Sequence, residues 1–109
     1  MSSSNPFTPL GNTAAFVAAA SAPTAVQVVA NTIGSTQYLI QNSGNVVVFV
    51  GTGPSATAAA ANAVTVTASN STIVLLPYTS QVYTMQSNNY FTGVASANAS
   101  VYITPGEGN

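Results

Sequence analysis

The chain of 109 residues contains no Lys, Arg, His, Cys or Asp, and Glu107 is its only acidic side chain, so its formal net charge is −1. General acid–base catalysis, nucleophilic catalysis, metal binding and phosphate recognition all depend on the side chains that are missing. The composition therefore predicts a protein that is not an enzyme and has no catalytic residues, metal site or cofactor. It also argues against nucleic acid as a partner, because single-stranded binders combine stacking aromatics with a positively charged groove.

Length and hydrophobic content predict one folded domain. Hydrophobic residues make up 47% of the chain and charged residues only 1%, whereas disordered chains usually combine low hydrophobicity with high net charge. No apolar run reaches the roughly 18 residues that cross a bilayer, so we expect no membrane partner. A surface without charge lacks colloidal repulsion and favours association. We therefore expect this chain to function within an assembly.

Residues 1–15 are interpreted as an N-terminal arm, and residues 16–109 as a single β-sandwich domain. Ser2–Pro9 is polar and contains two Pro residues and one Phe. A frayed terminus is the usual fate of such a segment; the alternative is an extended arm that crosses a neighbouring subunit. In the second interpretation the contact residues are Asn5, Pro6, Phe7, Pro9 and Leu10.

The apolar run Ala14–Ala20 precedes the first expected strand. No basic residue lies before it, and Pro23 would follow a cut after Ala22, so we do not interpret it as a signal peptide. Beyond it, short β-branched and aromatic segments recur between Gly, Asn, Ser and Pro, most of them roughly 8 to 12 residues apart, which is typical of an antiparallel sandwich or barrel. The expected strands are Ala25–Ala30, Gln37–Gln41, Val46–Val50, Val64–Thr67, Thr72–Leu76, Gln81–Met85, Asn89–Val94 and Ser100–Thr104.

The fold class predicted from this spacing is all-β, an antiparallel sandwich of about eight short strands with jelly-roll-like connections. Asn42–Asn45 contains residues that tolerate positive φ and suits a hairpin between two strands. Pro77 cannot donate to a strand ladder, so the preceding strand ends there or lies at an edge. Gly51–Asn62 is expected to be a loop, with at most one helical turn at Ala58–Ala61. Alternatively, it forms a flat surface of small residues that another chain approaches.

Two expected strands are apolar on both faces, Val46–Val50 and Ile73–Leu76. A strand of a simple sandwich has one solvent-facing side, so such runs require a second cover. Either loops or the arm supply it within the monomer, or it is a subunit interface. Core packing is the expectation for most of the nine Phe and Tyr residues. The residues assigned to core or interface are Val47, Phe49, Ile73, Leu75, Tyr90 and Phe91.

Several segments, taken in order, resemble small virion proteins of tailed bacteriophages. The segments are Asn5–Phe7, Asn42–Gly44 leading into Val46–Gly53, an Ala-rich loop, Leu75–Pro77, Asn89–Gly93 and, most specifically, Val101–Gly108. The resemblance implies a capsid cement or decoration protein on the outer capsid surface of the virion. Its implied partners are the major capsid protein and itself, as a homotrimer. A head fibre or tail component, or a surface β-module that binds a glycan-like ligand, remains the alternative. The glycan-binding module would require exposed aromatics beside acids or amides in a groove, and for this the chain offers only Asn, Gln and Tyr.

Overall fold

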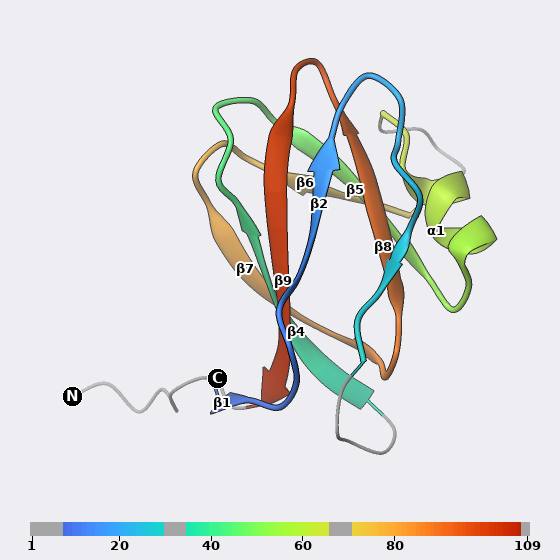
Figure 1. Cartoon of the computed structure of the whole chain (residues 1–109), viewed down its shortest axis with the longest axis vertical. Helices are drawn as coiled ribbons and strands as arrows, with labels where there is room; N and C mark the ends of the chain where they lie inside the picture. The colour runs from blue at the N-terminus through green and yellow to red at the C-terminus, as the bar shows by residue number, and fades with distance from the viewer. Residues whose placement is uncertain (1–7, 30–34, 66–70, 108–109) are drawn as a thin grey trace.

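Residues 8–29, 35–65 and 71–107 are described by the structure, a computed structural model, and they form two stacked antiparallel sheets with one short helix (Figure 1). Sheet A contains β1 (Thr8–Pro9), β2 (Ala14–Ala18), β4 (Ser35–Asn42), β7 (Ser80–Gln86) and β9 (Ala99–Glu107). Sheet B contains β3 (Val26–Gln27), β5 (Val48–Gly53), β6 (Thr72–Leu75) and β8 (Tyr90–Ala95), and the helix is α1 (Ala56–Asn62).

Strand pairing follows a nested pattern. β5 pairs with β6, β4 with β7, β3 with β8 and β2 with β9, always antiparallel. The pairs β4–β9 and β5–β8 then join these ladders into the strand orders β9-β4-β7 and β3-β8-β5-β6. One long hairpin, rolled so that its two arms are shared between two sheets, produces this order, which is that of a jelly roll. The all-β sandwich and its jelly-roll-like connections are confirmed.

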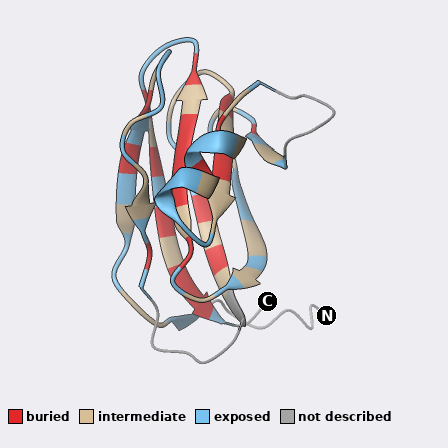
Figure 2. Cartoon of the chain, turned by 90° about the vertical axis from the view of Figure 1, so that its right-hand side faces the viewer, coloured by how far each residue is buried: buried red, intermediate tan, exposed pale blue. Residues whose placement is uncertain are grey.

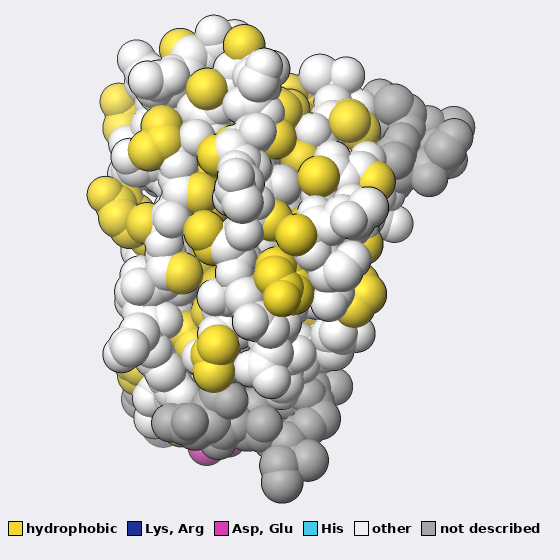
Figure 3. All heavy atoms as spheres, turned by 45° about the vertical axis from the view of Figure 1, so that its right-hand side comes forward, with side chains coloured by type: hydrophobic (Ala, Val, Ile, Leu, Met, Phe, Trp, Pro, Cys, Tyr) yellow, Lys and Arg dark blue, Asp and Glu magenta, His cyan; other side chains and the backbone are white. Residues whose placement is uncertain are grey.

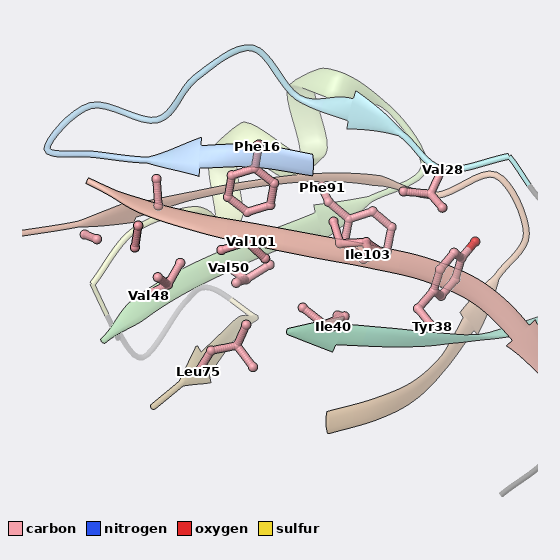
Figure 4. Packing of buried hydrophobic residues seen from close by; sticks show 13 residues of the cluster. Phe16, Val28, Tyr38, Ile40, Val48, Val50, Leu75, Phe91, Val101 and Ile103 are labelled. Atoms are coloured by element: carbon pink, nitrogen blue, oxygen red, sulfur yellow. The ribbon is translucent and has the colours of Figure 1, made fainter. Parts of the chain in front are cut away.

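Alternate side chains of the long strands point between the sheets and form one core. Tyr38 and Ile40 from sheet A meet Val48, Val50 and Phe91 from sheet B (Figure 4). The Tyr38 and Phe91 rings lie edge to face, with centroids 5.0 Å apart, the geometry that aromatic quadrupoles favour. Figure 2 shows the buried residues running along the inner strands and the exposed ones along the outer surface. Full burial of each large apolar side chain contributes about 1.5 to 3 kcal/mol.

The helix differs from the sequence expectation of a loop with at most one helical turn. α1 spans seven residues, and the Ser55 side chain caps its N-terminus by accepting a hydrogen bond from the Ala58 amide at 3.2 Å. Five of its residues are Ala, the best helix former. It packs on Gly51 and Gly53 of β5, where the missing side chains leave room for its backbone. The expectation was wrong because it weighed the Gly/Pro start of the segment above the cap and the Ala run.

Two parts of the described arm, residues 8–9 in β1 and residues 14–15 at the start of β2, belong to sheet A. Thr8 and Pro9 pair with Glu107 and Gly106 of the same chain, and the Leu10 amide donates to the Pro105 carbonyl at 2.8 Å. The strand β2 pairs along its whole length with β9. Sequence reasoning missed β2 because four of its five residues are Ala or Val and only Phe16 is aromatic.

Two further segments differ from the sequence expectation. The Asn42–Asn45 segment is not a hairpin, because β4 lies in sheet A and β5 in sheet B, so the segment crosses between the layers. The expected strand Val64–Thr67 is not formed at Val64 and Thr65, which lie in a bend, and its remaining residues lie outside the described part of the chain. Val64 and Thr65 follow Ala63, the C-cap of α1, so the chain is leaving the helix here and does not extend into a strand.

Candidate functional site

The described surface contains one ionisable carboxylate, that of Glu107, which is exposed beside Thr8 where β1 pairs with β9. Within the described ranges, no three His, Cys, Asp or Glu side chains lie together as metal ligands, and no helix has the length and hydropathy to cross a membrane. On the face drawn in Figure 3, hydrophobic side chains alternate with uncharged polar atoms, and acidic atoms are visible only at the lower end. Any recognition by this surface therefore depends on apolar contact and neutral hydrogen bonds.

The predicted arm contacts are only partly visible. Asn5, Pro6 and Phe7 lie outside the described residues. Pro9 is exposed in β1, and Leu10 is half-buried against β9. The described end of the arm is therefore held by its own chain, and its contact with a neighbouring subunit stays a prediction.

The residues assigned to core or interface separate into two groups. Leu75 and Phe91 are fully buried, and Ile73 packs against the core, so these three are core residues. The others, Val47, Phe49 and Tyr90, are half-buried. The sequence could not separate the two groups. It shows that a run is apolar on both faces, but not which face the second sheet covers.

Phe49 lies on the outer face of sheet B in a row of apolar side chains. It is in register with Val74 of β6 on one side and Val94 of β8 on the other. Val74 is 41% exposed, and Leu76, two residues further along, is 57% exposed. We call Phe49, Val74, Leu76 and Val94 the sheet B patch. A shallow hollow of ≈ 230 Å³ adjoins it, bounded by Phe49, Val94 and neighbouring small residues.

The helix covers only part of the outer face of sheet B. α1 lies over Gly51 and Gly53 (Figure 2). These glycines follow Phe49 by two and four residues in β5, so they share its face of the strand. α1 thus covers β5 beyond the apolar run Val46–Val50, and the sheet B patch within that run lies beside the helix. The strand β6 is also the last strand of sheet B, so the patch reaches a sheet edge, where strand backbones can pair with another chain.

Sheet A has a second exposed apolar feature that sequence reasoning assigned to core packing by default. Tyr78 is 72% and Tyr102 41% exposed, and both line a hollow of ≈ 420 Å³ at one end of the sheet's outer face. Of the aromatic residues in the described ranges, Tyr38 and Phe91 are fully buried and Phe16 is 5% exposed. The signal that could have found Tyr78 is its place directly after Pro77, in a turn rather than in a strand.

Comparisons of the chain with protein-family models, with curated proteins and with solved structures find no match.

Proposed function

We propose that this chain is a non-enzymatic structural protein of a bacteriophage particle, a cement or decoration protein that binds the major capsid protein on the outer shell and associates as a homotrimer. The observation that carries the proposal is the sheet B patch. Phe49, Val74 and Val94 form an apolar row that α1 leaves uncovered, and no charged side chain lies among the residues of β5, β6 and β8. Interface centres are depleted of charge and enriched in aromatic residues in the same way.

Two further points support the role. The segments that resemble virion proteins include Val46–Gly53 and Leu75–Pro77, and these contribute Phe49 and Leu76 to the patch. Jelly rolls serve as viral capsid domains as well as lectin domains, although a fold by itself does not decide function. The sheet B patch therefore supports the role, whereas the jelly roll alone does not.

Particle composition and a pair of matched variants test the proposal. Mass spectrometry of purified particles should find the chain at hundreds of copies. Val74→Ser should weaken its attachment about tenfold, which corresponds to about 1.4 kcal/mol of lost apolar contact. Val17→Ser is the control, because Val17 is 49% exposed on the other sheet. Absence from the particles, or equal attachment of the two variants, would contradict the proposal.

A further inference from the structure

A hollow of ≈ 420 Å³ lies where β4, β7 and β9 end beside the Pro77–Tyr78 turn. Gln41 stands in its middle, in register with Tyr102 of β9 on one side and with Ser80 of β7 on the other. The three side chains therefore form a row across the outer face of sheet A. Tyr78 and Thr79 bound the hollow from the turn. Its volume lies in the lower part of the range for ligand pockets, roughly 300 to 1,000 Å³.

Tyr78 occupies a backbone position that disfavours a large side chain. Its φ is 56°, in the left-handed region, and Pro77 precedes it. A Pro followed by a residue with positive φ is the pattern that type II turns use, and the second of these positions is normally Gly or Asn. The ring gains little packing in return, because the residue is 72% exposed. Folding would be better served by Gly here, so the aromatic ring at this position points to contact with a ligand.

Hydrogen bonds hold the turn in place. The Tyr78 amide donates to the Gly44 carbonyl at 3.2 Å, and the Thr79 hydroxyl donates to the Leu76 carbonyl at 2.7 Å. Below them the Asn42 amide group donates to the carbonyls of Val46 and Leu76 at 2.9 and 3.2 Å. A site fixed in this way loses little conformational freedom when a ligand binds.

We propose that this hollow, the Tyr78–Tyr102 site, binds a neutral carbohydrate, with one pyranose ring of an oligosaccharide lying against the tyrosines. A pyranose has an apolar C–H face suited to an aromatic ring and hydroxyls at its rim that both donate and accept hydrogen bonds. Within the described ranges, no hydrogen bond engages the side-chain amide of Gln41, the Ser80 hydroxyl or the phenol hydroxyls of Tyr78 and Tyr102. All four groups are therefore available to a ligand. No charged side chain lines the hollow, so a sugar carrying carboxylate or phosphate would find no counter-charge.

A proline-rich peptide is the competing ligand, because such peptides also dock in aromatic-lined grooves. It offers mainly carbonyl acceptors, whereas Gln41 and Ser80 can donate and accept at once. Vicinal sugar hydroxyls use both capacities. The polar groups of the site therefore favour the carbohydrate.

An NMR titration of the full chain with cellotetraose, maltotetraose and a β-galactoside tests the inference. At least one probe should shift the amide signals of residues 41–43, 78–80 and 102, with a Kd of about 1 mM, as suits a shallow site with about 4 kcal/mol of binding energy. Tyr78→Gly should weaken binding tenfold or more while leaving the melting temperature equal or higher, and Tyr78→Phe should retain binding within about threefold. Gln41→Leu should weaken binding, whereas Gln86→Leu, an exposed change at the other end of β7, should not.

The inference is overturned if none of the sugars shifts these signals at tens of millimolar. It is also overturned if Tyr78→Gly binds as well as the parent, or if a proline-rich peptide binds at these residues and the sugars do not. The site shares no residue with the sheet B patch, but Leu76 of the patch begins the turn that carries Tyr78. Gln41→Leu, in β4 of the other sheet, should therefore leave attachment to particles unchanged. A failure here is therefore distinguishable from a failure of the proposed virion role.

Discussion

At the scale of single residues, Asn42 links the strand ends around the Tyr78–Tyr102 site. Its side chain is buried, its amide nitrogen contacts the carbonyls of Val46, Leu75 and Leu76, and its oxygen accepts from the Gly44 amide at 2.9 Å. Sequence reasoning identified Asn42 only as a turn former. The pattern shows that a polar residue ends a strand, but the three carbonyls that surround it come from segments up to 34 positions away.

Asn42→Ala should destabilise the fold by about 2 to 4 kcal/mol, because buried carbonyls then lose their donor. Urea denaturation measures the change. Asn45→Ala is the matched control, since Asn45 is an exposed neighbour, and its effect should stay within about 0.5 kcal/mol. Equal effects of the two variants would show that the Asn42 network contributes nothing to stability.

Tyr38 should make the folded state sensitive to alkali. Burial raises the pKa of its phenol above the ordinary value of 10.0, although the backbone amides of Asn89 and Asn88 partly oppose the shift. The folded chain then holds this proton more tightly than the unfolded chain does. Stability is therefore constant below the unfolded pKa and declines as the pH rises from there through the folded pKa.

Tyr38→Phe should flatten this decline while lowering stability at neutral pH by about 1 kcal/mol, because the hydroxyl donates to the Gln86 carbonyl at 2.8 Å. Urea midpoints at pH values of about 8 and about 11, on either side of the ordinary tyrosine pKa, separate the two effects. A parent protein that loses no more stability over this range than the Phe variant would contradict the prediction.

At the scale of elements, α1 and β5 are adapted to each other through Gly51. A Cβ placed there would collide with backbone atoms of Ala59 and Ala63 and would lie 2.6 Å from the Asn62 carbonyl carbon. The helix can approach the sheet closely only over a residue without a side chain. This close contact holds the weakly hydrophobic, Ala-rich helix on the sheet.

Gly51→Ala should cost about 1 to 3 kcal/mol or more, the usual penalty for overpacking, since the neighbouring atoms are backbone and cannot rotate away. Ala60→Ser provides the control because Ala60 is exposed on the same helix. Thermal unfolding with both variants measures the difference. If Gly51→Ala unfolds at the parent temperature, the close packing of α1 on β5 is not needed for stability.

Strand existence was predictable because its signals are local: a continuous apolar run at the start of Val48–Gly53 and an alternation of buried and more exposed positions in Ala99–Glu107. The pairing of these strands was not, because β9 joins β2, β4 and β1, whose partners lie about 60 to 100 positions apart in the chain and leave no local pattern. The same limit hid the Tyr78–Tyr102 site. Its row of Tyr102, Gln41 and Ser80 is assembled by register between three strands and is invisible along the sequence.

At the scale of the whole molecule, the jelly roll places two different uncharged surfaces on opposite sheets. The sheet B patch is apolar and lies beside the β6 edge, whereas the Tyr78–Tyr102 site is concave and mixes rings with hydrogen-bonding groups. The chain has a single acidic residue and no basic residue. Side-chain charge therefore neither guides a partner to either surface nor contributes to the contact. Binding at both surfaces should therefore depend on salt and pH only as apolar burial and neutral hydrogen bonds do.

Attachment to a partner should accordingly be insensitive to salt and to mild pH change. The Debye length shortens from about 10 Å at 0.1 M to about 3 Å at 1 M, which weakens exposed ion pairs but not apolar contacts, and concentrated salt can strengthen the latter slightly. The Kd should change by less than about threefold between low salt and about 1 M sodium chloride, a shift below about 0.7 kcal/mol. It should also stay flat from about pH 5.5 to 9, where no side chain of this chain has its ordinary pKa. Sedimentation of the assembly across these conditions measures both.

A tenfold loss of affinity with salt, for a partner whose own fold is unaffected, would place the contact at Glu107 or the chain termini, since no other described group carries a charge that salt could screen.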